Sequence, residues 1–276
     1  MSKAKAVYLH ALTPLHVGTG QAVANLDLPI AREKATGFPI IPASSFKGVL
    51  RDHFSGKDWL NHAFGDKNKA GAFVFTDLRL LCLPVRSYFG TFAYVTCPLV
   101  LQRYNRMQEA FGAGQSIPNV PNVQDGSNSL KVAICNNSVL GCDNRVYLED
   151  LDLEIDNIEV SQIASLFASI FFKDQPSLFT ERFAIVSDST FSFLAETATE
   201  VVARVRLQDD TKTVASGALW YEEALPAESL LYGFIGLADC PPSQNTTLLA
   251  HLPPELTLQI GGDATIGRGV CRVVIQ

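Results

Sequence analysis

Short strand-like runs alternate with amphipathic helical segments along this 276-residue chain, and this alternation constrains the fold more than any other feature. Residues 6–12 (AVYLHAL) and 72–85 (AFVFTDLRLLCLPV) are rich in β-branched, aromatic and other apolar residues, which is typical of strands. Residues 98–112 predict a helix that ends at Gly112, and residues 160–172 predict another. No segment repeats at a fixed period. The pattern therefore predicts an α+β fold.

The first helix is expected directly after the extended segment FPIIPASS, with Ser44 or Ser45 as its N-cap. Lys47 and Arg51 lie four residues apart and share one flank of this helix. A helix start beside two cations favours phosphate binding, because its first N–H groups and its dipole attract anions. The structural alternative is an ordinary solvated flank. The neighbouring face has helical apolar spacing, which predicts burial of five residues: Phe46, Val49, Leu50, His53 and Phe54.

The second half of the chain predicts further strands and a hairpin. Residues 130–135 and 145–156 are typical of strands. The runs VVARVRL and TVASGALWYEE flank the turn QDDTK, which predicts a β-hairpin over about residues 197–224. A glycine-rich loop joins two final strands within residues 255–275. The segment 112–129 is rich in Pro, Gly and Asn, and it predicts a mobile surface excursion.

The charge of the chain is unevenly distributed. Its net charge of −6 argues, by itself, against a nucleic-acid-binding protein. Residues 1–60, however, hold seven Lys or Arg against four acids, a balance of +3. Residues 143–200 hold three Lys or Arg against twelve acids, a balance of −9. One face could therefore follow phosphates while another repels them.

Membrane, targeting and metal signals are weak. No apolar run approaches the ~18 residues that span a bilayer, and the N-terminal residues lack the cleavage site of a signal peptide. The six cysteines contain no CxxC spacing, so neither structural zinc nor disulfide bonds are expected. Cys82 and Cys271 are expected to be small buried hydrophobes. These features predict a cytoplasmic protein without a membrane partner.

Four motifs, in the order expected of one family, give the chain a specific resemblance. The C-terminal segment GGDATIGRGVCRV is similar to the glycine-rich loop of the RAMP proteins of CRISPR systems. TPLHVGTG, DLPIAREKATGFPIIPASSFKGVLR and GALWYEEALP resemble one branch of that superfamily, the repeating backbone subunit (Cas seven type) of the type III-B (Cmr) effector. The resemblance touches residues 1–51, 217–226 and 261–276, whereas residues 85–200 carry little signal.

The resemblance implies an α+β fold with a ferredoxin-like (RRM-like) RAMP core, inserted lobes and a thumb-like β-hairpin. It implies one elaborated domain over residues 1–276. The expected parts are a palm-like core over roughly 1–111, 130–160 and 225–276, a mobile loop at about 112–129, and a thumb at about 197–224.

The resemblance also implies a function. Several copies would line up along a CRISPR guide RNA together with other Cmr subunits, and the thumb of each copy would enter the paired guide and target RNA. Target RNA would be cut at regular intervals by an endoribonuclease reaction, in which the RNA's own 2′-hydroxyl attacks and leaves a cyclic phosphate. A loop aspartate would act with a divalent metal, Mg²⁺ or Mn²⁺, that RNA oxygens also bind.

Asp27 matches the catalytic aspartate of that family by its place in the loop before the PI dipeptide. Transesterification needs a group that takes or orients the 2′-hydroxyl proton, or that holds a metal near the phosphate. A single carboxylate is a poor metal site, so RNA and water would supply the other ligands. Without the resemblance, an ordinary solvated turn aspartate is the better interpretation, because surface carboxylates are common.

Two further segments are candidates for RNA binding. The loop at Gly267, Arg268 and Gly269 would let backbone N–H groups approach guide phosphate, and a tight turn between two strands is its structural alternative. Arg204 and Arg206 share one face of the expected hairpin. That face suits a nucleic-acid backbone, and a plain solvated hairpin explains it equally well.

Two residues are candidates for supporting the cleavage centre. His16 could carry a proton there, although a hydrogen-bonded structural histidine is the favoured interpretation. Glu223, with its neighbour Glu222, could support the loop or the thumb. Packing of Trp220 and Tyr221 explains the same segment as well.

Two other functions stay open at this point. A non-catalytic RNA-binding scaffold of the same kind of complex would use Asp27 only to shape a loop. A nuclease that processes the guide precursor would need a more complete set of catalytic groups than one aspartate offers.

Overall fold

The computed structural model describes residues 3–20, 26–208, 210, 214–238 and 247–276. In chain order the strands are β1 (Ala4–Ala11), β2 (Ile40–Ile41), β3 (Phe73–Phe75), β4 (Leu78–Arg86), β5 (Phe92–Thr96), β6 (Leu130–Ile134), β7 (Gly141–Cys142), β8 (Arg145–Leu148), β9 (Leu151–Ile155), β10 (Phe183–Val186), β11 (Glu200–Leu207), β12 (Val214–Ala224), β13 (Leu230–Leu237), β14 (Glu255–Gln259) and β15 (Val270–Ile275). The helices are α1 (Ala43–His53), α2 (Leu60–Phe64), α3 (Pro98–Phe111), α4 (Ser161–Phe171), α5 (Ser177–Thr180), α6 (Asp188–Thr197) and the short 3₁₀ turns η1 (Leu248–His251) and η2 (Ala264–Ile266).

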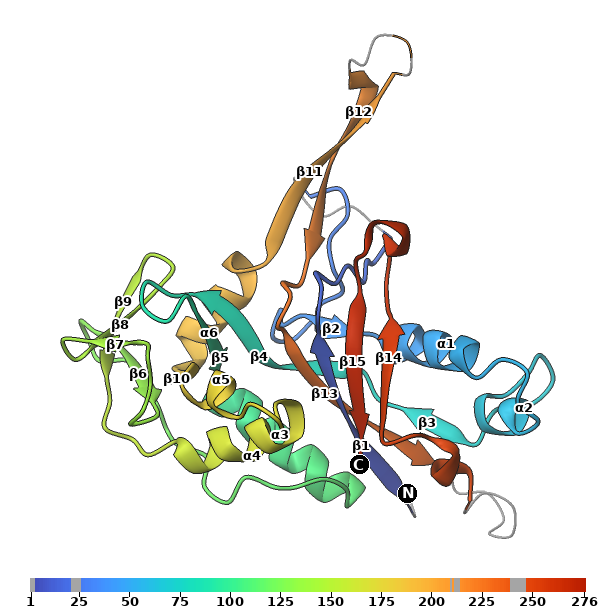
Figure 1. The fold of residues 1–276 in the computed structure, drawn as a ribbon, viewed down its shortest axis with the longest axis horizontal. Coiled ribbons are helices and arrows are strands. Elements are labelled where there is room, and N and C mark those ends of the chain that lie inside the picture. Colours follow the sequence, from blue (N-terminus) through green and yellow to red (C-terminus); the bar gives the residue numbers. More distant parts are fainter. Residues whose placement is uncertain (1–2, 21–25, 209, 211–213, 239–246) are drawn as a thin grey trace.

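The fold is mixed α+β, built on a large sheet that is mostly antiparallel (Figure 1). The strand order is β14-β15-β1-β13-β4-β5-β10-β6-β9-β8-β7, with β2 added to β4 and β3 to β13. Among these pairs only β5–β10 and β6–β9 run parallel. Strand β13 lies between β1 and β4 and is buried along its whole length. This strand therefore belongs to the hydrophobic core over its entire length.

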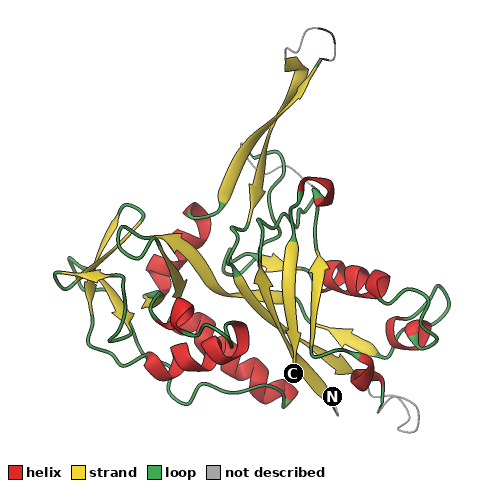
Figure 2. Cartoon of the chain, viewed as in Figure 1, coloured by secondary structure: helices red, strands yellow, loops and turns green. Residues whose placement is uncertain are grey.

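The helices form two groups around this sheet (Figure 2). Helices α1 and α2 lie beside β14 and β3, whereas α3 and α4 pack against the central strands, with α5 and α6 near them. Strands β11 and β12 pair antiparallel as a separate two-stranded sheet that projects from the rest of the molecule (Figure 1). No helix in the described part of the chain is long and apolar enough to cross a bilayer.

The predicted N-cap of the first helix is wrong. Helix α1 begins at Ala43, so Ser44 and Ser45 lie inside its first turn, and no side chain of the preceding residue caps it. The Ala43 N–H instead donates to the Asp77 carboxylate at 2.8 Å. The acceptor comes from a residue distant in sequence, and an acidic group at this end of the helix also suits the helix dipole.

The apolar face predicted for α1 is shorter than expected. Phe46, Leu50 and Phe54 are buried, whereas His53 is exposed and rests edge-on against the Phe54 ring. The prediction of a core histidine is therefore wrong, because the helix turns its last residues towards solvent.

Two predicted strands are divided. The run 72–85 becomes β3 and β4, because Thr76 Oγ1 accepts the Phe234 N–H at 2.9 Å and Asp77 serves α1. Residues 145–156 become β8 and β9, joined by a tight turn in which Glu149 has a φ of 48°. The apolar pattern alone predicts one continuous strand in each run, but polar side chains interrupt the first and a residue in the left-handed conformation interrupts the second.

The excursion at residues 112–129 contains no helix or strand. Ile117 and Val123 within it are buried. The Asn105 side chain of α3 accepts the Ile117 N–H and donates to the Ile117 carbonyl, both at 2.7 Å. The segment is thus fastened to the body at defined points, and its mobility stays a prediction.

Candidate functional site at the base of the hairpin

The loop that carries Asp27 lies along the edge of β12, where the hairpin leaves the body. The Leu28 N–H donates to the Tyr221 carbonyl, and the Glu223 N–H donates to the Leu28 carbonyl, both at 3.0 Å. The Asp27 carboxylate accepts the Tyr221 N–H through Oδ2 at 2.8 Å. Asp27 is exposed. One carboxylate oxygen is therefore anchored on the hairpin while the side chain remains open to a ligand.

Glu223 connects the hairpin to this loop with both its side chain and its backbone. It is almost fully buried. Its Oε2 accepts the Ile30 N–H at 3.0 Å, and its Oε1 accepts from Arg32 at 2.5 Å and from Thr199 at 2.9 Å. A carboxylate that accepts from three donors, two in the Asp27 loop and one just before β11, is a structural junction.

His16 is the second neighbour of Glu223. Its Nδ1 lies 2.6 Å from the Glu223 carbonyl oxygen. Because a carbonyl oxygen only accepts, Nδ1 carries the proton, and a neutral ring then presents Nε2 as an acceptor. A Cβ on Gly18 would lie 2.7 Å from that Nε2, so glycine at this position leaves room for the ring. Asp27 and His16 therefore bind the backbone of the same strand two residues apart, Asp27 at Tyr221 and His16 at Glu223.

The glycine-rich loop meets the other side of the hairpin base. The Arg268 guanidinium donates to Glu222 Oε1 at 2.7 Å, and both residues are buried. Arg204 lies 3.5 Å from Glu222 and 3.6 Å from Asp263. Burial, together with the neighbouring Asp263 carboxyl group, raises the pKa of Glu222 despite the two guanidinium groups. We define these residues, Arg204, Glu222, Asp263 and Arg268, as the hairpin-base ion cluster.

This cluster changes the interpretation of two predicted RNA contacts. Arg268 and Arg204 are engaged inside the protein, whereas Arg206 on the same strand as Arg204 is exposed. Gly267 and Gly269 have φ values of 82° and 75°. A Cβ on Gly269 would lie 2.0 Å from the Ile260 carbonyl oxygen, so glycine is required there by the turn itself.

The α1 cations lie apart from this centre. Arg51 donates to the Gly65 carbonyl and to Asn61 Oδ1 at 3.1 Å, so it fastens α1 to α2. Lys47 is half-buried and makes no hydrogen bond or ion pair with another described residue. Among the described residues, no hydrogen bond or ion pair joins Lys47 or Arg51 to Asp27, His16 or Glu223. Sequence reasoning placed the two cations together, but only Lys47 remains available to a ligand.

The protein side of this site supplies one ligand to a divalent cation and not a complete coordination shell. The described residues contain no group of three His, Cys, Asp or Glu side chains able to hold a metal. Asp27 offers one carboxylate, one oxygen of which already accepts an N–H group. RNA oxygens and water would have to complete any coordination shell.

Residues 8–272 match the RAMP superfamily in a comparison with protein families. The chain is 34% identical over 290 residues to the CRISPR system Cmr endoribonuclease Cmr4 of Pyrococcus furiosus, across 99% of this chain and 96% of that protein. A crystal structure of oligomeric Cmr4 from Pyrococcus furiosus superposes with a TM-score of 0.82 at 30% identity, covering 100% of this chain and 99% of that one. A cryo-EM structure of the type III-B Cmr-beta complex bound to cognate target RNA contains a chain with the same fold, with a TM-score of 0.76 at 22% identity, covering 99% and 97%.

Proposed function

The chain belongs to the RAMP superfamily, and from this premise we propose that it is a repeating backbone subunit of a type III-B CRISPR effector, an endoribonuclease that binds guide RNA and cuts complementary target RNA at regular intervals. One observation carries the proposal for the site. Asp27 is exposed and anchored on β12 at Tyr221, two residues before the Glu223 carbonyl that binds His16. This geometry supports contact between the Asp27 carboxylate and RNA at the base of the hairpin.

The proposed reaction is an intramolecular transesterification. The 2′-hydroxyl oxygen forms a bond to the adjacent phosphorus, the bond from phosphorus to the 5′-oxygen breaks, and a cyclic phosphate and a 5′-hydroxyl result. Asp27 would take or orient the 2′-hydroxyl proton, and the His16 Nε2 is a second acceptor within the same group. A bound Mg²⁺ or Mn²⁺, held by Asp27 and RNA oxygens, would neutralise charge on the phosphate.

The fold supports two finer assignments. Strands β15-β1-β13-β4 are all antiparallel neighbours and have the spatial order of a ferredoxin-like core, fourth-first-third-second. The projecting β11–β12 hairpin corresponds to the thumb of such a subunit (Figure 1). The remaining division into palm core and loop at 112–129 is part of the same proposal.

The proposed partners are guide RNA, target RNA, further copies of this chain and other Cmr subunits, in the cytoplasm. Support comes from two similar structures, one of oligomeric Cmr4 and one of type III-B Cmr-beta bound to target RNA. Base pairing would supply the sequence specificity, and the protein would bind the RNA backbone.

The complex reconstituted with guide and end-labelled complementary RNA tests this function. We expect a ladder of cuts at a constant spacing, and the ladder should disappear with EDTA and return with Mg²⁺ or Mn²⁺. Non-complementary RNA is the control. Assembly on guide and target without any cut would replace the endoribonuclease with a scaffold, and a ladder unchanged by EDTA would remove the metal from the proposal. Cleavage of repeat RNA by the isolated chain would indicate a guide-processing enzyme.

Lys47→Gln and Arg51→Gln form a matched pair for the guide-binding surface. Lys47 has no described protein partner, so we expect Lys47→Gln to weaken guide binding and to lower the slope of log affinity against log salt by about one. Arg51 binds Asn61 of α2 and the Gly65 carbonyl, so the main effect of Arg51→Gln should be a lower free energy of unfolding. Filter binding over a salt series and urea unfolding measure the two effects. An unchanged salt slope for Lys47→Gln would remove this lysine from the RNA interface.

A further inference from the structure

Two adjacent residues of the Asp27 loop, Arg32 and Glu33, bind different parts of the molecule. Arg32 contacts the hairpin base, whereas Glu33 contacts the body of the sheet and α3. Together we call them the loop clasp. Neither residue belongs to the group formed by Asp27, His16 and Glu223, and neither is exposed.

Arg32 joins three segments through one guanidinium group. Its Nη1 donates to the Gly37 carbonyl at 2.8 Å and to the Ala195 carbonyl at 2.9 Å, close to the end of α6. Its Nη2 donates to Glu223 Oε1 at 2.5 Å. The planar guanidinium suits this arrangement, because its donors have fixed directions and its charge is favourable near a helix C-terminus. Arg32 thereby fixes the loop against both the hairpin and α6.

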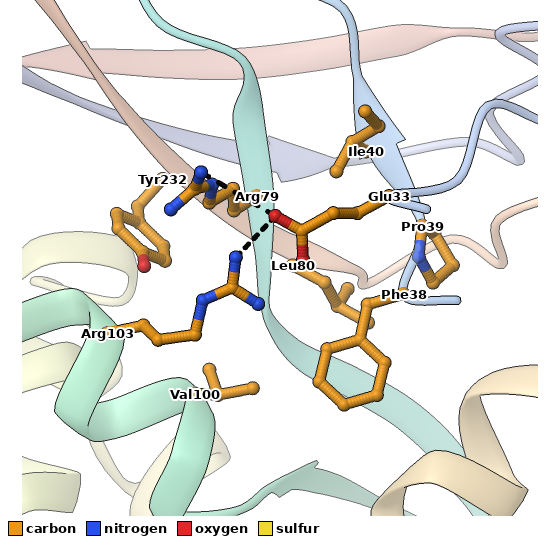
Figure 3. A pocket seen from close by; sticks show the side chains of 9 residues that line it. All are labelled: Glu33, Phe38, Pro39, Ile40, Arg79, Leu80, Val100, Arg103 and Tyr232. Atoms are coloured by element: carbon orange, nitrogen blue, oxygen red, sulfur yellow. Dashed lines mark hydrogen bonds and ion pairs between the residues drawn. The ribbon is translucent and has the colours of Figure 1, made fainter. Parts of the chain in front are cut away.

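Glu33 joins the loop to the body on the other side (Figure 3). Its Oε1 accepts from Arg103 of α3 and lies 3.6 Å from Arg79 of β4, and its Oε2 accepts from Thr36 at 2.7 Å. The hydrogen bond from Arg103 holds the pKa of Glu33 below its usual value. Glu33, Arg79 and Arg103 line a cavity of about 10 Å³, room for about one water molecule. The carboxylate is therefore enclosed by protein partners.

Between the clasp and Asp27 the chain has little freedom. Only four residues separate Asp27 from Arg32, and Ile30 among them pairs with Gly18 and donates to Glu223. Because Arg32 and Ile30 share the Glu223 carboxylate, loss of Arg32 leaves that buried acid with one charged partner fewer. A displaced Glu223 would move Leu28, which pairs with its backbone, and with it Asp27.

We infer that Arg32 and Glu33 are positioning residues for Asp27, which hold its carboxylate in register with the hairpin. This inference rests on the proposed function, since it concerns the residue assigned to cleavage. Arg32 is linked to Asp27 through the loop and through Glu223, whereas Glu33 is linked to it through the loop alone. They therefore act on the rate of the chemical step, because a displacement of about 1 Å at a reacting group costs about 100-fold in rate.

The test uses the complete reconstituted complex with Arg32→Gln, Glu33→Gln and the control Lys34→Gln, whose side chain is exposed on the same loop. Single-turnover cleavage and target affinity are measured separately. We expect a cleavage rate ~10- to 100-fold lower for the two clasp variants, with target affinity within about twofold of the parent. Arg32→Lys should recover part of the rate, because it keeps the charge but loses the second donor direction.

Hydrogen exchange gives a readout independent of activity. In Arg32→Gln and Glu33→Gln, peptides covering residues 26–31 should exchange faster, whereas peptides from β1 and α4 should not change. Wild-type cleavage by both clasp variants, in a complex where Asp27→Asn is inactive, would overturn the inference and leave the proposed function intact. Full cleavage by Asp27→Asn would instead overturn the role of Asp27, while the exchange data would still report on the clasp. Equally fast exchange throughout a clasp variant would indicate general unfolding and contradict a positioning role.

Discussion

Asp27→Asn is expected to lower target cleavage by about 10²- to 10⁴-fold while target affinity stays at the parent value. Asparagine has nearly the size of aspartate, and its amide oxygen can still accept the Tyr221 N–H that anchors the loop. It lacks the negative charge, so it cannot take up the 2′-hydroxyl proton and gives a divalent cation no charged ligand. The variant thus removes the chemistry and keeps the geometry.

The measurement is a single-turnover time course on end-labelled target RNA, with affinity determined in parallel. Asp150→Asn is the matched control, since Asp150 is an exposed aspartate in the distant β8–β9 turn. It should cut at the parental rate. A ladder of parental intensity from Asp27→Asn would show that cleavage depends on another group, and His16→Gln would become the next variant to measure. Cleavage lost together with binding would contradict a purely chemical role.

Local signals account for the elements that the sequence predicted well. Helix α3 ends at Phe111 with Gly112 in the left-handed conformation, where glycine is favoured. Strands β11 and β12 flank a polar turn and pair antiparallel as expected, although part of that turn lies outside the described residues. Such features are encoded within a few residues of one another, so a single sequence is enough to locate them.

The central strand β13 shows where such reasoning ends. Its sequence LLYGFIGL is buried on both faces and has no alternation. A short continuous apolar run cannot be distinguished from a buried helix by periodicity. Its identity as a strand depends on pairing with β1 and β4, whose partner residues lie more than a hundred positions away.

The candidate site, too, was predictable only where it does not depend on partners distant in sequence. Asp27 was found through the family resemblance, since nothing in its neighbours distinguishes it from a solvated aspartate. Arg268 was expected to bind phosphate, but it is turned inward by Glu222, 46 positions earlier. The Arg32–Glu223 contact spans 191 positions. Charge partners of this kind depend on the placement of the hairpin base, which the local pattern does not contain.

Arg268→Gln is expected to destabilise the protein by about 3–5 kcal/mol at neutral pH, because it leaves the buried Glu222 carboxylate without its closest partner. The pKa of Glu222 is raised by burial and by Asp263, so the native state holds a proton that the unfolded chain has already released. The stabilising contribution of this group is full below the unfolded pKa and is lost as pH rises through the native pKa. Removing Arg268 removes an opposing cation, so the loss of stability should be larger at pH 8 than at pH 5.

Urea unfolding at the two pH values measures this effect, with Arg206→Gln as control, because Arg206 is exposed on the same hairpin. The control should change stability by less than about 0.5 kcal/mol. The double variant Arg268→Gln with Glu222→Gln should be more stable than Arg268→Gln alone, because Arg204 and Asp263 then remain as a balanced pair, 3.6 Å apart. Additive losses in the double variant, or a loss independent of pH, would mean that Arg268 stabilises the hairpin base by packing and not by its charge.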